Sequence, residues 1–396
     1  MNRLITRLLA IILLLCSSPA AAQDFSGYLA AEANIFVHQP TYDGQSSHSI
    51  SIAAQPELYH EWAGGTSFTF VPFGRLDSAD PNRTHGDIRE LNMFWIDDSW
   101  EFRIGIGKVF WGATEFVHLV DIINQTDIVE SIDAEEKLGQ PMGHLSLLND
   151  WGVVELFILP YFRERTFPGV EGRLRTEPIV DTELASYESG KQQSNTDFAV
   201  RYSHTLGDWD LGIYHFSGTS RDPTLIPGAD EHGQVVLIPY YEQINQTAVD
   251  LQMVSGEWLW KLEALHRVGQ GDHFTAATGG FEYSFIGIND SAVDLGVIVE
   301  YVYDSRGSSA TTPFQDDVIL GLRLAFNDLR DTTLLAGWFQ DRHTAAKIIQ
   351  LEAGRRIGEL FKLSLELRVF CGQPENDPLH SLRNDDHLQL ELAYYF

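Results

Sequence analysis

Cysteine and basic residues are both scarce in this chain of 396 residues. Its two cysteines are Cys16 and Cys371, and Cys16 lies in an N-terminal segment that we expect to be removed, so we expect no disulfide within the mature chain. Lysine and arginine number 27 against 56 aspartates and glutamates, a formal charge of -29, which becomes -31 on loss of the two positive charges of Arg3 and Arg7. This balance argues against nucleic acid as a partner, because phosphates would be repelled, and it is typical of solvated acidic loops.

Long apolar runs are missing beyond the first 22 residues. The mean hydropathy of -0.14 excludes a bundle of membrane helices, yet it fits a membrane β-barrel, in which half of each strand faces water. Residues 1–22 combine the two arginines, an apolar run from Leu8 to Cys16 and three alanines before a cut, and this pattern predicts a secretory signal peptide. A lipoprotein signal at Cys16 is the alternative, which the bulky Leu15 disfavours.

Signatures of catalysis and of metal binding are also missing. The chain has no Gly-x-Ser-x-Gly elbow, no phosphate-binding loop and no His-Glu-x-x-His pair, and its 14 histidines are dispersed. We therefore predict no enzyme, no metal site and no cofactor. A hydrolase is kept as an alternative, because His144 and Ser146 would share one face of a strand, although no third orienting group is evident.

Alternation of apolar and polar residues is what the chain has in abundance. From Gln23 onward it falls into pieces of roughly nine to eleven residues, the length that a tilted membrane strand needs. The clearest pieces are 293–303, 318–326 and 361–369, where every second residue is Val, Leu, Phe or Tyr. This period predicts β-strands with one apolar and one polar face.

The connections between these strands alternate between short turns and longer polar segments, with a break at 342–344 as the exception. If both termini lie on the side of the short turns, the number of strands is even. We count eighteen, from 25–37 to 387–396, with sixteen as the alternative; 142–148 is counted as a strand and 235–241 as part of a loop. The predicted longer segments are 38–47, 77–86, 111–140, 164–194, 217–242, 270–275, 305–315 and 372–384.

Five of the nine tryptophans lie within a few residues of a proposed short turn, where the aromatic girdle of a membrane barrel belongs. The alternative, the core of a soluble β-sandwich, would scatter them through strand interiors. The five are Trp62, Trp100, Trp151, Trp209 and Trp258.

The last ten residues form an alternating strand whose outermost residue is aromatic. This ending resembles the C-terminal signature of bacterial outer-membrane β-barrels. The resemblance implies that the strand pairs with the first one, that the barrel assembly machinery reads it, and that outer-membrane lipid and lipopolysaccharide surround the protein. Its alternating apolar residues are Leu388, Leu390, Leu392, Tyr394 and Phe396.

One internal motif narrows this resemblance. A strand ends in Gly, a basic residue and then Trp-Gly, and an Asp-x-x-Asn-x-x-Asp segment follows, which is similar to a poorly characterised family of bacterial outer-membrane porin-like β-barrel proteins. In that family Pro usually follows the Asn, whereas Gln125 stands here, which leaves the conformation of the segment open. The motif consists of Gly107, Lys108, Val109, Phe110, Trp111 and Gly112, then Asp121, Ile122, Ile123, Asn124, Gln125, Thr126 and Asp127.

Residues 111–140 carry the strongest functional pattern. Phe116, Leu119, Val120 and Ile123 recur at helical spacing, and Lys137 is the only basic residue. We expect this segment to fold into the barrel mouth with its apolar side on the wall and its carboxylates facing water, a ring that would favour cations. The alternative is a loop that rises into solvent or packs beneath the others. The candidate constriction residues are Glu115, Asp121, Asp127, Glu130, Asp133, Glu135 and Glu136.

The polar edges of the strands carry charges of both signs in equal number. Interleaved charges either line a water-filled pore or pair as structural struts. The candidate lumen-wall residues are Arg103, Lys261, Glu263, Arg267, Glu300, Arg323, Lys362, Glu366 and Arg368, with Glu101, Asp294 and Glu391 completing the balance.

We therefore predict an all-β fold in which residues 23–396 form a single transmembrane antiparallel β-barrel of sixteen to eighteen strands, with short periplasmic turns and long extracellular loops. Such a strand number leaves an aqueous passage. The expected function is passive diffusion of small hydrophilic solutes across the outer membrane of a Gram-negative bacterium, with a preference for cations. The alternative is a non-conducting barrel that serves as an export partner or surface anchor, with 164–194 and 217–242 as binding surface.

Overall fold

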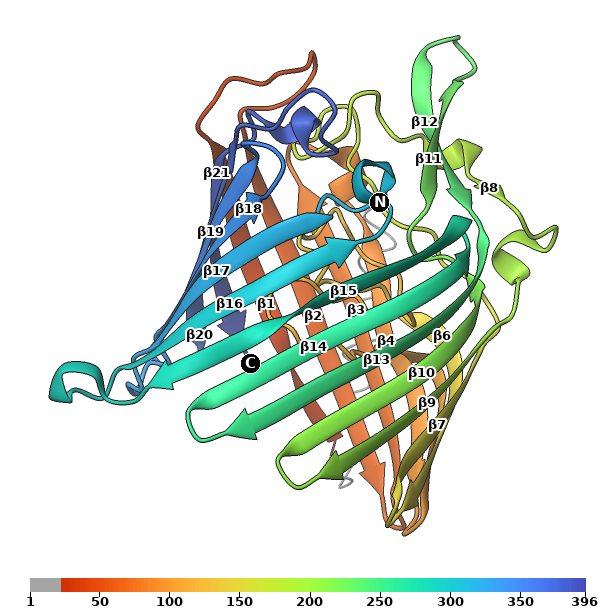
Figure 1. Ribbon diagram of the computed structural model, residues 1–396, viewed down its shortest axis with the longest axis vertical. Coiled ribbons are helices and arrows are strands. Elements are labelled where there is room, and N and C mark those ends of the chain that lie inside the picture. The colour runs from red at the N-terminus through yellow and green to blue at the C-terminus, as the bar shows by residue number, and fades with distance from the viewer. Residues whose placement is uncertain (1–22) are drawn as a thin grey trace.

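The computed structural model describes residues 23–396, and these form a closed antiparallel β-barrel of eighteen strands (Figure 1). The signal peptide predicted at 1–22 lies outside the described residues. The first strand, β1 (Gln23–Phe36), pairs with β2 (His48–Trp62) on one side and with β21 (His387–Tyr395) on the other. The predicted pairing of the last strand with the first is thus confirmed, as is the count of eighteen. A sheet closed in this way has no free edge.

The other barrel strands follow each other around the wall in chain order. They are β3 (Thr66–Asp77), β4 (Gly86–Ile96), β5 (Trp100–Gly107), β6 (Gln140–Asn149), β7 (Gly152–Leu159), β9 (Asp197–Leu206), β10 (Trp209–Thr219), β13 (Gln243–Ser255), β14 (Trp258–Gly269), β15 (Gly271–Phe285), β16 (Asp294–Asp304), β17 (Asp316–Ala325), β18 (Thr333–Asp341), β19 (Lys347–Ile357) and β20 (Phe361–Cys371).

A second, three-stranded sheet rises from the barrel, with a hairpin that projects beyond the rim (Figure 1). It consists of β8 (Ser186–Tyr187), β11 (Thr224–Ala229) and β12 (Val235–Tyr241). The only helices among the described residues are single turns: η1 (Pro81–Arg83), η2 (Thr182–Leu184), η3 (Gln192–Ser194), η4 (Ile288–Asp290), η5 (Gly307–Ser309) and η6 (His380–Leu382). No helix in this part of the chain is long and apolar enough to cross a membrane.

The period of two sets which side chains point outward. In β14, Trp260 and Leu262 are exposed on the outer surface, whereas Lys261 and Glu263 point into the barrel. Leu and Ile side chains of other strands are exposed in the same way, so the outer surface carries a broad apolar belt. An apolar surface of this extent marks contact with lipid or with another protein rather than with water.

The two rims of the barrel differ. The short-turn rim holds both described chain ends and the turns that follow β2, β4, β6, β9, β13, β15, β17 and β19, whereas the long-loop rim holds the remaining connections. Four of the five tryptophans predicted at short turns are exposed there, and Trp100 is half-buried; the exposed four are Trp62, Trp151, Trp209 and Trp258.

Three local predictions have different outcomes. The predicted strand at 142–148 is confirmed as part of β6, whereas residues 235–241, assigned to a loop, lie outside the barrel wall but form β12. The predicted long segment 270–275 is wrong, because β14 and β15 are joined at Gln270 alone. Gly269 and Gly271 on either side have positive φ angles of 115° and 68°, so they permit a tight turn in a stretch that composition alone marks as a loop.

Candidate functional site

The connection between β5 and β6, residues 108–139, runs inside the barrel; we call it the lumen segment. It contacts inward-pointing side chains on well-separated strands, Arg75 of β3, Glu263 of β14 and Arg368 of β20. The helical spacing of its apolar residues was misleading, because this fully described segment contains no helix. Its apolar residues therefore do not form one face of a helix. Val120 and Ile123 are buried in a cluster with side chains of β7 and β10.

Glu263 is the main anchor of the lumen segment. Its carboxylate is fully buried on the wall, where one oxygen accepts hydrogen bonds from the N–H of Ala113 at 2.6 Å and from the N–H and hydroxyl of Thr114 at 3.0 and 2.8 Å. The other oxygen accepts from the N–H groups of Leu119 and Val120 at 2.6 and 3.1 Å. A single carboxylate therefore organises the turn at 113–120, and these donors in turn offset the cost of burying it.

A second wall carboxylate repeats this arrangement next to the first. Glu300 of β16 accepts hydrogen bonds from the N–H groups of Glu115 and Phe116 at 2.7 and 3.2 Å. The side chain of Glu115 then turns to the wall, where it pairs with Lys261 at 3.3 Å and with Arg323 at 2.5 Å. The wall thus holds both the backbone and the side chain of Glu115.

Two glycines make room for the ring of Phe116. Gly321 of β17 and Gly337 of β18 are register partners, and a Cβ added to either would lie 2.9 Å from an atom of that ring. Real Cβ contacts are essentially never this short, so the glycine pair forms a notch in the wall that only a residue without a side chain leaves open.

The Asp-x-x-Asn-x-x-Asp motif joins distant parts of the lumen segment to each other and joins the segment to the barrel wall. Asp121 accepts hydrogen bonds from the N–H groups of Trp111 and Gly112 at 2.7 and 3.2 Å, which fixes the start of the segment. Asn124 donates to the carbonyls of Gly107 and Leu138 at 2.8 Å each, which clips both ends together.

Asp127, the last residue of the motif, is tied to the wall. One of its carboxylate oxygens meets Arg89 of β4 at 2.7 Å and His85 at 3.2 Å, and the other accepts from the hydroxyl of Thr166. Gln125, which replaces the expected Pro, donates to the carbonyl of Arg163 at 3.2 Å, so this position also binds the next long loop.

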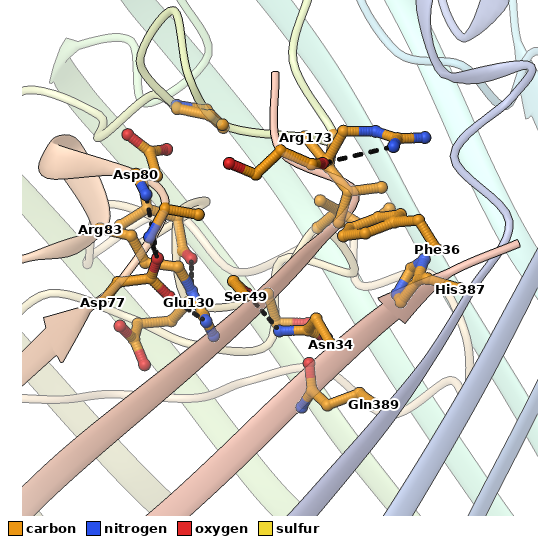
Figure 2. Close-up of a pocket in the computed structure, with 18 of the residues that line it drawn as sticks. Asn34, Phe36, Ser49, Asp77, Asp80, Arg83, Glu130, Arg173, His387 and Gln389 are labelled. Atoms are coloured by element: carbon orange, nitrogen blue, oxygen red, sulfur yellow. Dashed lines mark hydrogen bonds and ion pairs between the residues drawn. The ribbon is translucent and has the colours of Figure 1, made fainter. Parts of the chain in front are cut away.

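Further along, the lumen segment lies against β3 and β20. Glu130 pairs with Arg75 at 2.8 Å, and Asp133 pairs with Arg368 at 3.2 Å. Figure 2 shows where the segment meets β1: Glu130 lies near Arg83 and Asp77, and Asn34 lines the same small cavity of about 70 Å³.

The predicted ring of water-facing carboxylates therefore needs a correction. Five of the seven candidates are bound to basic side chains or backbone N–H groups, namely Glu115, Asp121, Asp127, Glu130 and Asp133. Of the seven candidates, only Glu135 and Glu136 have no ion pair among residues 23–396. Sequence cannot reveal such pairing, because the partners lie far away in the chain.

The unpaired and the paired carboxyl groups differ in acidity. Burial and the nearby charges of Asp133 and Glu352 raise the pKa of Glu135 to about 7. Burial also acts on Asp133, but there the Arg368 guanidinium outweighs it and holds the pKa below its usual range. Glu135 is thus the acid of the lumen segment that changes charge near neutral pH.

The structure places the nine candidate wall residues on the inward face of the barrel. Glu263 and Glu300 bind the lumen segment, as described, and Lys261, Arg323 and Arg368 pair with its carboxylates. The others lie elsewhere on that face: Arg267 hydrogen-bonds Gln246, Arg103 is the register partner of His144, and Lys362 and Glu366 line the short-turn chamber defined below.

A cavity of about 580 Å³ lies between the lumen segment and the short-turn rim; we call it the short-turn chamber. Nine acidic and three basic side chains among the described residues line it, so its formal charge is strongly negative. They are Glu32, Glu115, Glu130, Asp133, Glu135, Glu136, Glu352, Glu366 and Glu391, and Arg75, Arg323 and Lys362.

A second cavity of about 280 Å³ lies on the other side of the lumen segment, toward the long loops; we call it the long-loop chamber. Six basic and four acidic side chains of the described chain line it, together with several phenylalanines. The charged residues are Lys137, Arg165, Arg221, Arg267, Arg306 and Arg368, and Asp121, Asp133, Asp222 and Asp304. Asp133 borders both chambers.

The long loops are tied to one another above this chamber. Arg173 pairs with Asp385 at 2.7 Å and also donates to the carbonyls of His38 and Ser46, so one guanidinium joins three loops. Its guanidinium carbon lies 4.3 Å from the centre of the Phe36 ring (Figure 2).

The pair His144 and Ser146 does not have the geometry of a hydrolase. The hydroxyl of Ser146 lies 3.2 Å from Nε2 of His144, and a carboxylate that the sequence analysis missed, Glu155, lies 3.0 Å from the same nitrogen. A catalytic triad uses the two ring nitrogens for its two partners, whereas here both partners compete for one.

Basic residues near the N-terminus were also missed. Arg75, Arg83 and Arg89 hold Glu130, the carbonyl of Val129 and Asp127, yet none was a candidate. The register between β3 and β4 skips Arg89, so simple alternation fails in β4, whereas in β3 the inward face carries the apolar Val71 and Phe73 beside Arg75 and does not show as a polar edge.

No family model and no curated protein matches the chain. Solved structures do resemble it: OmpT, an outer membrane protein of Vibrio cholerae folded in vitro and in trimer form, has 9% identity and a TM-score of 0.49 over 95% of this chain and 100% of that one. A mutant of the Rh. blastica porin has 13% identity and a TM-score of 0.46 over 94% and 100%. The resemblance to a porin-like family remains a prediction, and evidence on function comes from the lumen of this chain.

Proposed function

We propose that the protein is an outer-membrane channel through which small hydrophilic solutes diffuse, with the lumen segment as its constriction. The observation that carries this proposal is the fixed position of that segment. Hydrogen bonds that the segment donates to Glu263 and its ion pairs with Arg75 and Arg368 hold it across the barrel, with a chamber lined by charged side chains on either side. A segment that narrows a wide barrel in this way sets the size and charge of what passes.

The apolar belt supports a membrane location, because it would be costly to expose to water and fits the hydrocarbon core of a bilayer. The exposed tryptophans of the short-turn rim fit one membrane interface. We infer that this rim faces the periplasm and that the long loops face outward.

Bilayer recording of the purified mature protein tests the channel. We expect stable single-channel steps whose size depends on the lumen segment. Absence of conductance at every voltage, from protein whose β-structure is intact by circular dichroism, would contradict the proposal.

A cation preference is the finer part of the proposal. The negative formal charge of the short-turn chamber supports it, because a narrow passage lined with one sign of charge concentrates ions of the other sign. A reversal potential measured in a tenfold salt gradient should have the sign of cation selectivity. Anion selectivity would reject this part and leave the channel intact.

The projecting hairpin of β11 and β12 favours a second candidate, a barrel that acts as an export partner or surface anchor. Val235 and Ile226 are exposed on it, as expected of a surface that contacts another molecule. Lack of conductance together with a partner that co-purifies only when residues 224–241 are present would select this candidate.

A further inference from the structure

The long-loop chamber combines two kinds of wall. Phe116, Phe314, Phe339 and Phe370 give one side an aromatic surface, continuous with a buried apolar cluster of β17 to β20. Lys137 and five arginines add basic charge, and one of these arginines, Arg368, lies on β20 two residues from Phe370. A purely ionic passage has no need of an aromatic wall, so this chamber is built for a solute with both an apolar and a charged part.

Lys137 is the cation in this chamber whose charge is least compensated. Its side chain is only 6% exposed, and its ammonium group donates no hydrogen bond within residues 23–396; its carboxylate partner, Asp121, has an oxygen 3.8 Å away. Burial and the positive charge of Arg165 lower its pKa, although Asp121 partly offsets this. The ammonium has no hydrogen-bond acceptor in this part of the chain and borders the chamber, where an anion would supply one.

Two arginines of the chamber are also only partly compensated. Asp222 is shared by two guanidinium groups, those of Arg165 at 2.5 Å and Arg267 at 3.5 Å. The Nε–H of Arg368 is buried without any hydrogen-bond partner. The chamber therefore offers positive charge that its own carboxylates do not neutralise.

We propose that the long-loop chamber binds a small monocarboxylate with an apolar body, its carboxylate on Lys137 and its body on the phenylalanine wall. The proposal rests on the channel function, since it names the class of solute that the channel takes up first. A volume of about 280 Å³ limits that solute to a small molecule. Inorganic anions lack the apolar part, and cations meet the wrong charge.

Equilibrium dialysis of radiolabelled 3-phenylpropionate against the full mature protein in detergent, with protein-free micelles as blank, tests the site. We expect saturable binding at one site per barrel. Unlabelled 3-phenylpropylamine, which has the opposite charge, should not compete, and 3-phenylpropanol should compete only weakly. Non-saturable binding, or equal competition by the amine, would overturn the proposal.

Variants assign the binding to the chamber. Lys137→Met should weaken binding at least tenfold, whereas Lys191→Met, at an exposed lysine of the long-loop rim, should leave it unchanged. If Lys137→Met does not fold, Phe314→Ala, outside the lumen segment, should weaken 3-phenylpropionate binding several-fold with little effect on acetate. Unchanged binding in a folded Lys137→Met or Phe314→Ala protein would contradict the proposal.

Bilayer recording of the same preparations separates the two hypotheses. Conductance without saturable binding overturns the carboxylate site and leaves the channel standing. Saturable binding without conductance leaves the site standing and overturns its role in passage.

Discussion

The two chambers of the lumen differ in charge and in polarity although one segment separates them. The short-turn chamber is wide and acidic, and the long-loop chamber is small and lined by both basic and aromatic side chains. The lumen segment contributes to both, with Glu135 and Glu136 facing one and Lys137 the other. Three consecutive residues thus help to set opposite electrostatic environments on the two sides of one constriction.

This difference shows that the net charge of a lumen does not by itself determine which solutes and ions it selects. A solute entering from the long loops meets a basic and aromatic environment first and an acidic one afterwards. Recognition and ion preference can therefore be separated in space and changed independently. The variants proposed here affect either the lumen segment, which separates the chambers, or residues that line one chamber.

The largest effect is expected from Glu263→Ala, which removes the anchor of the boundary. The turn at 113–120 would lose the acceptor for four N–H groups and one hydroxyl. Leaving a buried donor unsatisfied costs about 1–3 kcal/mol, so we expect the segment to leave the wall and single-channel conductance to rise at least about twofold.

Glu257→Gln is the matched control, since it changes an exposed glutamate in the turn before the same strand. Its conductance should equal that of the wild type. Unaltered conductance in a folded Glu263→Ala protein would show that the anchor is unnecessary.

Sequence patterns predicted the barrel because the period of two is a local property. Residues 361–369 reveal their two faces whatever they pair with, and closure by the last strand was implied by its resemblance to known barrels. Residues 270–275 were wrongly predicted as a loop because they are mostly polar. A strand can continue past the apolar belt, and its residues there need not be apolar.

The candidate site was only partly predictable. The sequence pointed to the right segment, and Glu263 and Glu300 were placed among the wall residues. Their role as acceptors for backbone N–H groups could not be predicted, nor could the pairing of Asp133 with Arg368, because these contacts join residues more than a hundred positions apart. Arg75 was missed because the inward face of β3 also carries the apolar Val71 and Phe73, and Arg89 was missed because the register shift interrupts alternation in β4.

The second prediction concerns the short-turn chamber, which is the acidic one. In a Glu135→Gln, Glu136→Gln double variant the short-turn chamber loses the two carboxylates of the lumen segment that have no ion pair. We expect the preference for potassium over chloride to fall by about half, because local charge sets local ion concentration. Reversal potentials measure it, with Glu359→Gln, in an exposed short turn, as control. An unchanged preference would assign selectivity to other residues.

The third prediction concerns the pH dependence of cation preference, to which Glu135 in the short-turn chamber contributes. Glu135 has a pKa of about 7, raised from its ordinary value of 4.5, so it is charged at pH 8 and mostly neutral at pH 6. Cation preference should therefore decrease as the pH falls through 7. The nearby carboxylate of Glu263 raises the pKa of His118 above its ordinary value, so His118 gains positive charge as the pH falls and acts in the same direction.

The variant Glu135→Gln separates the two groups. It should keep only the part of the pH dependence that His118 supplies, so its reversal potential should change less between pH 8 and pH 6 than that of the wild type. Equal pH profiles would mean that Glu135 does not titrate in this range.

The smallest effect is expected from Gly337→Ala, which fills part of the notch behind Phe116. The new methyl group would lie 2.9 Å from a ring atom, so the ring must shift toward the long-loop chamber. Overpacking of this kind costs about 1–3 kcal/mol when the neighbours cannot move, but this ring borders a cavity and can. We therefore expect an unchanged conductance and a roughly twofold weaker binding of 3-phenylpropionate in equilibrium dialysis. Gly143→Ala, at a strand glycine with open space around it, is the control and should leave both quantities unchanged. A change in ion preference with Gly337→Ala would mean that the two sides of the constriction are coupled, because the notch touches only the aromatic side.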